Sequence, residues 1–141
     1  MEQKSPYTFN NFIYLILILE IFHSAFGIMT NSIALLEPEY IEFQGQIIQK
    51  TSHTFNIANI IYGVFIIISI TLILKKMKLG VFIFFASCLF YDIVILAIGG
   101  KTMIGNTVIS FLYMPLMAIL LCLQSNKRSA WSVLFQKRTD Q

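Results

Sequence analysis

The sequence predicts an all-α integral membrane protein, a bundle of four transmembrane helices with a short interfacial helix in its first outer loop. Of its 141 residues, 57% are hydrophobic and only 12% are charged, and the mean hydropathy is +0.75. A soluble domain of this length cannot bury so much apolar surface, so lipid must act as the solvent. Four apolar runs approach or reach the length that crosses a bilayer, namely residues 12–29, 55–74, 79–98 and 107–123.

The first apolar run is expected to be a membrane span and not a signal peptide, because it carries Glu20 near its centre and lacks a small-residue cleavage site. The second and third runs are separated only by the lysine-rich link "KKMK". The fourth run contains Pro115, which we expect to kink its helix, as prolines commonly do in membrane spans. The sequence shows no internal repeat and no second soluble domain, so residues 1–141 are predicted to form one membrane domain.

Two shorter segments are predicted to lie in the membrane surface. In "PEYIEFQGQIIQK", Pro38 suits the first turn of a helix, and Tyr40, Phe43 and Ile47 would then share one face. The C-terminal tail, residues 129–138, places a Trp and apolar side chains ahead of a basic end. This pattern is typical of an amphipathic anchor with its Trp at the level of the lipid headgroups.

The distribution of basic residues predicts that both termini are cytoplasmic. The link between the second and third spans and the two tails contain Lys4, Lys75, Lys76, Lys78, Lys127, Arg128, Lys137 and Arg138. The loops on the opposite side contain only Lys50 and Lys101, together with three Glu residues. Cytoplasmic loops are enriched in Lys and Arg, so the side with more basic residues is expected to face the cytoplasm.

Each expected span carries one stripe of polar or small residues among large apolar ones. The members of the four stripes include Glu20, His23, Ser24, Asn56, Asn59, Tyr62, Cys88, Tyr91, Asp92, Ser110 and Tyr113. Residues three, four and seven positions apart share a helix face, and a bundle in lipid turns such faces inward. Counting along the spans places these groups in one layer between the midplane and the outer face. We therefore expect a pocket that holds Glu20, His23 and Asp92. Its walls are predicted to be Ser24, Asn59, Tyr62, Tyr91, Ser110 and Tyr113.

The two acids and the histidine are the candidate catalytic residues. An ionisable group at the bilayer centre costs about 2.5–3.5 kcal/mol on insertion scales, so such groups are commonly functional. Glu20 or Asp92 would donate or accept a proton, and His23 would set its protonation. The alternative interpretation is that these groups only hold the helices together. Glu20-x-x-His23 matches half of a di-metal site, but the further ligands are lacking, so neither a metal nor a cofactor is predicted.

The segment "YLILILEIFHSAFGIM" resembles the first helix of small multidrug-resistance antiporters, which are four-helix proteins with one essential membrane glutamate. The resemblance implies a carrier in which Glu20 exchanges protons for a cation. The chain departs from that family in its long loop between the first two spans, in the presence of His23 and Asp92, and in its strong charge bias. It also lacks a Gly-rich third helix.

Three functional classes remain open. The leading interpretation is a membrane protein whose polar pocket binds a lipophilic small molecule and acts on it by acid/base chemistry, as an isomerase, a cyclase or an epoxide-opening enzyme. The first alternative is a non-catalytic subunit or partner-binding protein of a larger membrane complex, or a homo-oligomer. The second alternative is a proton-coupled small-molecule carrier. The expected partners are the lipid bilayer and a lipophilic molecule, and no surface for nucleic acid is visible.

Overall fold

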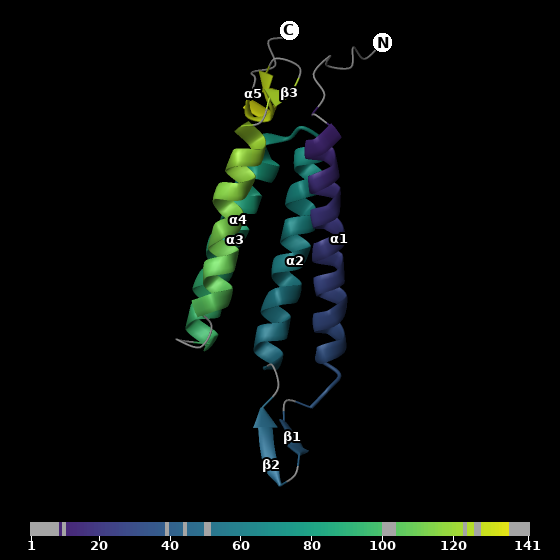
Figure 1. The fold of residues 1–141 in the computed structure, drawn as a ribbon, viewed down its shortest axis with the longest axis vertical. Helices are drawn as coiled ribbons and strands as arrows, with labels where there is room; N and C mark the ends of the chain where they lie inside the picture. Colours follow the sequence, from purple (N-terminus) through teal and green to yellow (C-terminus); the bar gives the residue numbers. More distant parts are fainter. Residues whose placement is uncertain are drawn as a thin grey trace.

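Four long helices follow one another along the chain in the computed structural model (Figure 1). The structure describes residues 9, 11–38, 40–43, 45–49, 52–99, 104–122, 124–125 and 128–135. The helices are α1 (Asn11–Ala34), α2 (His53–Leu74), α3 (Lys78–Gly99), α4 (Ile104–Cys122) and the short α5 (Ala130–Phe135). Two small antiparallel hairpins are formed by β1 (Tyr40–Phe43) with β2 (Gln46–Gln49), and by β3 (Gln124–Ser125) with β4 (Arg128–Ser129).

The long helices pack in sequence order: α1 on α2, α2 on α3, and α3 on α4. We call the end of the bundle where α1 begins and α2 ends the terminal end. The opposite end is the hairpin end, beyond which β1 and β2 project. The α3–α4 pair leans away from α1 toward the hairpin end (Figure 1).

Among the described residues, three helices, α1, α2 and α3, are long and apolar enough to cross a membrane. They are consistent with a multi-pass membrane protein. α4 is shorter, with 19 residues, and contains Pro115. A fourth crossing by α4 and the cytoplasmic placement of the termini stay predictions.

The apolar core of the described chain lies toward the terminal end. Ile13 and Leu17 of α1, Ile70 of α2, Phe84 of α3 and Leu121 of α4 are almost completely buried there. Large apolar side chains also cover the exposed faces of these helices, as lipid-facing surfaces require. The four helices are therefore held together mainly at the terminal end of the bundle.

Glycines set the close approach between neighbouring helices. A Cβ atom on Gly80 of α3 would lie 2.5 Å from the Ser69 carbonyl oxygen of α2 and 2.7 Å from the Ile73 nitrogen. A Cβ atom on Gly63 of α2 would lie 2.8 Å from Cγ1 of Ile28 in α1. Small residues allow helix backbones to approach in this way in membranes, where packing drives helix association.

The described helices agree closely with the expected second and third spans, but α1 is longer than predicted. It continues to Ala34, whereas the expected span covers residues 12–29. Thr30 Oγ1 and Asn31 Nδ2 donate hydrogen bonds to the Gly27 carbonyl oxygen, at 3.0 and 2.7 Å. Because these side chains are satisfied by the helix itself, they do not end it.

The predicted interfacial helix in the first loop is wrong, because the segment forms the β1–β2 hairpin. Ile41 pairs with Ile48 and Glu42 pairs with Ile47, while Gly45 lies in the turn with φ 75°. Aromatic and β-branched residues favour strands, and glycine adopts the positive φ of a tight turn without strain. The predicted amphipathic tail contains α5, and residues 136–138 lie outside the described residues.

Candidate functional site

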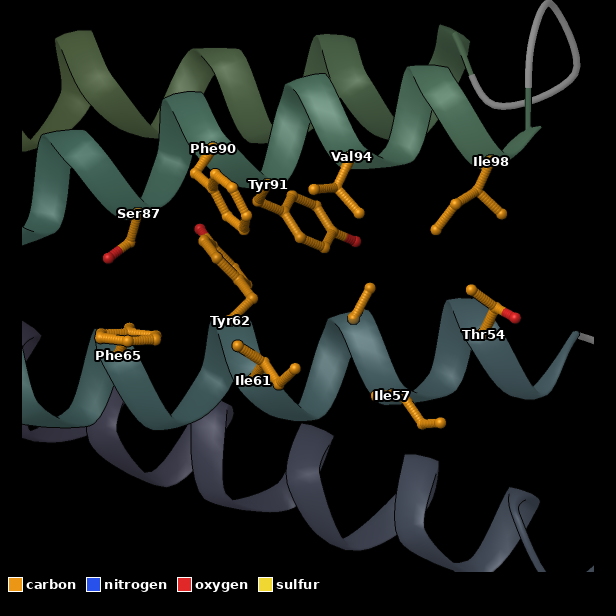
Figure 2. Close-up of a pocket in the computed structure, with 11 residues that line it drawn as sticks. Thr54, Ile57, Ile61, Tyr62, Phe65, Ser87, Phe90, Tyr91, Val94 and Ile98 are labelled. Atoms are coloured by element: carbon orange, nitrogen blue, oxygen red, sulfur yellow. The ribbon is translucent and has the colours of Figure 1, made fainter.

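Two stacked tyrosines join α2 and α3. The rings of Tyr62 and Tyr91 have centroids 4.3 Å apart and an interplanar angle of 27°. Their hydroxyl groups point in opposite directions along the helices (Figure 2). Tyr91 donates to Asn59 Oδ1 at 2.6 Å, and Tyr62 Oη lies 3.6 Å from Cys88 Sγ. Asn59 is itself fixed by a 3.0 Å bond from Nδ2 to the Phe55 carbonyl oxygen. Both hydroxyl groups are therefore engaged within the protein.

A groove with a volume of about 270 Å³ runs along the α2–α3 contact (Figure 2). In Figure 2, α1 lies on the far side of α2 from this groove. The groove is lined from α2 by Thr54, Ile57, Ala58, Ile61, Tyr62 and Phe65, and from α3 by Ser87, Phe90, Tyr91, Val94 and Ile98. The two tyrosine rings thus contribute to its surface.

The groove is open to the outside of the molecule and its lining is apolar. Ile57, Ile61 and Phe65 of α2 and Phe90 of α3 are all exposed, so its rim faces the surroundings of the helices. The Ser87 hydroxyl donates to the Ile83 carbonyl oxygen at 2.7 Å. The remaining surface consists mainly of methyl groups and ring faces, which is the chemistry of a site for a lipophilic ligand.

Of the candidate wall residues on α1 and α2, only Tyr62 lines this groove. Ser24 is buried on α1, and its carbonyl oxygen would lie 3.4 Å from a Cβ atom on Gly63 of α2. Asn59 supports Tyr91 but does not line the groove. Asn56 is only 2% exposed, and its Nδ2 atom has no hydrogen-bond partner in the part of the chain that the structure describes.

The two candidate acids lie on either side of the Tyr62 level. Ser24 of α1 and Cys88 of α3 both contact α2 at that level, through Gly63 and Tyr62. Glu20 comes four residues before Ser24, toward the terminal end of α1. Asp92 comes four residues after Cys88, toward the hairpin end of α3.

At a rise of 1.5 Å per residue, Glu20 and Asp92 are about 12 Å apart along the helix axes. Both carboxyl groups lie within electrostatic range of the buried Cys88 thiol. Asp92 is buried and Glu20 is half-buried. Along the helix axes, the level of Cys88 therefore lies between the levels of Glu20 and Asp92.

The remaining candidate residues are distributed around the helices. His23 is exposed on α1 and lies within electrostatic range of Glu20. Ser110 and Tyr113 belong to α4, but their side chains lie outside the described residues, so the fourth wall of the pocket stays a prediction. No three His, Cys, Asp or Glu side chains in the described ranges are grouped so that they could hold a metal ion.

Sequence reasoning did not identify the apolar part of the groove. Ile57, Ile61, Phe65, Phe90 and Val94 are of the same residue types as the lipid-facing side chains elsewhere. Only the register between α2 and α3 brings them to one seam. The available signal was the pair of tyrosines that occupy similar depths in the second and third spans.

No family model, no curated protein and no solved structure matches this chain.

Proposed function

We propose that this chain is a membrane protein that binds a lipophilic small molecule in the α2–α3 groove. The observation that supports the proposal is a lateral, apolar groove on two helices that are apolar enough to cross a membrane. Small-molecule pockets have volumes of about 300–1,000 Å³, and an apolar cavity of about 150 Å³ binds benzene. A groove of about 270 Å³ therefore suits a small or slender ligand.

The chemistry of the lining favours a neutral ligand that arrives through the bilayer. The residues that line the groove include no Asp, Glu, His, Lys or Arg. Binding would thus depend on dispersion contacts and on the ring faces of Tyr62, Phe65, Phe90 and Tyr91. Because the open rim lies on apolar helices, a ligand dissolved in the membrane reaches it by lateral diffusion.

An acid/base enzyme is the second candidate, and one contact favours it. Tyr62 lines the groove with its ring and approaches Cys88 with its hydroxyl group, and Cys88 is within electrostatic range of Glu20 and Asp92. A bound molecule would lie one side chain away from this polar region. Isomerisation, cyclisation or epoxide opening would require Tyr62 to move, so we place this reaction behind simple binding.

The carrier, the subunit of a larger complex and the homo-oligomer are proposals that rest on the sequence alone. The same is true of the cytoplasmic placement of the terminal end. This placement is supported by Lys75, Lys76 and Lys78, which lie between or at the ends of α2 and α3.

Filling the groove tests the proposed function. Ala58→Trp places a large ring among the lining residues of α2, and Ala25→Trp adds the same ring on the exposed side of α1 as a matched control. Molecules that copurify with each protein in mild detergent would be extracted and quantified by mass spectrometry. We expect the wild-type protein and Ala25→Trp to retain the same lipophilic molecule.

Ala58→Trp should retain at least about tenfold less of this molecule, equivalent to ~1.4 kcal/mol of binding free energy. Equal retention by all three proteins would contradict the proposal.

A further inference from the structure

We infer that the groove binds a single extended acyl chain, from an amphiphile whose polar head lies at the hairpin end of α2 and α3. This inference rests on the proposed function and names the class of its ligand. It depends on three properties of the groove: its length, its volume over that length, and a lining whose tyrosine and Ser87 hydroxyl groups are already hydrogen-bonded within the protein.

The length of the groove matches one leaflet. It extends from Thr54 to Phe65 on α2 and from Ser87 to Ile98 on α3, which is an advance of about 16 Å on each helix at 1.5 Å per residue. Thr54 and Ile98 lie at one end in Figure 2, and Phe65 and Ser87 lie at the other. The hydrocarbon core of a bilayer is about 30 Å thick, so one leaflet spans about 15 Å. The groove therefore begins near the helix ends and stops at the depth where an acyl chain ends.

The volume of the groove is small for this length. A cavity of about 150 Å³ holds the six carbon atoms of benzene, so about 270 Å³ corresponds to roughly 11 carbon atoms by proportion. Spread over about 16 Å, these atoms form a narrow file and not a compact group of fused rings. A single flexible chain is the occupant that fits both measures.

Apart from Thr54, which lies at one end of the groove, the polar groups that line it are already hydrogen-bonded within the protein. The hydroxyl groups of Tyr62, Tyr91 and Ser87 are already engaged with Cys88 Sγ, with Asn59 Oδ1 and with the Ile83 carbonyl oxygen. A methylene chain in the groove would not break any of these hydrogen bonds. The polar head of the amphiphile would lie beyond Thr54, the second residue of α2, where the helices leave the apolar layer.

Photoactivatable probes test the acyl-chain inference on the full-length protein in phosphatidylcholine vesicles. One probe is palmitic acid with a diazirine in the middle of its chain, and the other is a diazirine-bearing cholesterol analogue. We expect the acyl probe to label Ile61, Phe65 and Phe90 at least about tenfold more than Phe22, an exposed residue of α1 outside the groove. Unlabelled fatty acids of about 12–16 carbons should compete for this labelling, whereas chains of about six carbons should not, since the groove accommodates roughly 11 carbons.

Groove-filling variants separate a site from ordinary contact with bulk lipid. Ala58→Trp on α2 and Val94→Trp on α3 should each reduce acyl labelling of Phe90 by about tenfold and leave Phe22 unchanged. The two substitutions lie on opposite walls, so either one decides the question if the other protein does not fold. Labelling that neither substitution reduces would overturn the inference.

The two probes also distinguish the inference from the proposed function. If the sterol probe labels the groove and the acyl probe does not, the acyl-chain inference fails while binding of a lipophilic molecule stands. If neither probe labels the groove above the level of Phe22, both fail.

Discussion

The substitution Gly80→Ala is expected to separate α2 from α3. The added Cβ atom would lie 2.5 Å from the Ser69 carbonyl oxygen, 2.7 Å from the Ile73 nitrogen and 2.9 Å from Cβ of Leu72. Two of these three neighbours are backbone atoms, which no side-chain rotation can move. The helices must therefore shift apart, and the Tyr62–Tyr91 contact further along the same seam should loosen.

The magnitude follows from two opposing effects. Overpacking a closely packed interface costs about 1–3 kcal/mol, and replacing glycine by alanine within a helix returns about 0.5–1 kcal/mol. Gly80→Ala should therefore lower the free energy of unfolding by about 0–2.5 kcal/mol. Gly27→Ala is the matched control, because nothing lies within 4 Å of its Cβ position, and it should stabilise by about 0.5–1 kcal/mol. Gly63→Ala should fall between them, because the Ile28 side chain that it meets is able to rotate away.

Reversible unfolding in mixed micelles, with increasing sodium dodecyl sulfate and helicity followed by circular dichroism, measures these differences. The predicted order of stability is Gly27→Ala, then Gly63→Ala, then Gly80→Ala. The α2–α3 register would be refuted if Gly80→Ala were as stable as Gly27→Ala. Gly63→Ala as the least stable variant would instead locate the tightest helix contact between α1 and α2.

Three further predictions concern the tyrosines, an acid and the orientation. Tyr91→Phe should lower the free energy of unfolding by about 0.6–1 kcal/mol in the same assay, because it removes the 2.6 Å hydrogen bond to Asn59. Tyr62→Phe should lower it by less, because the Tyr62 oxygen lies 3.6 Å from the Cys88 sulfur. Equal losses of stability would contradict the assigned hydrogen bonds. Asp92→Asn should leave acyl labelling of the groove within about twofold of wild type, because this side chain does not line it, and a tenfold loss would show contact with the ligand. In a background without native cysteines, an impermeant thiol reagent on intact cells should label Glu37→Cys at the hairpin end, and should label Met77→Cys only after permeabilisation. The reverse pattern would invert the orientation.

Apolar run length predicts most of the helical structure. Residues 55–74 and 79–98 were expected as spans, and α2 and α3 cover His53–Leu74 and Lys78–Gly99. An apolar run of this length has few structural alternatives in a membrane, since only a helix provides hydrogen bonds for every backbone N–H and C=O group within one segment. The amphipathic spacing of the first loop predicts a helix there, but the structure has the β1–β2 hairpin, because strand propensity and Gly45 favour two strands joined by a turn.

The groove shows what a single sequence does not contain. Tyr62 and Tyr91 stand out among apolar neighbours, and both line the groove. Phe65 and Phe90 do not stand out, because an apolar residue that faces lipid and one that faces a ligand look alike in sequence. Which apolar residues of α2 lie opposite which apolar residues of α3 depends on the axial offset between the two helices. That offset is set by the approach of Gly80 to α2, a packing detail that hydropathy does not encode.

The depth of Glu20 illustrates how one helix end changes a functional hypothesis. With a span ending at Met29, Glu20 lies near the centre and His23 beyond it. With α1 extending to Ala34, Glu20 lies on the terminal side of the centre, about 12 Å along the axis from Asp92. Acid/base chemistry that used both acids would have to bridge this axial separation, for example through a relay at the level of Cys88. Groove binding needs no such relay. It depends only on the apolar side chains that already line the groove, and for this reason we place it ahead of catalysis.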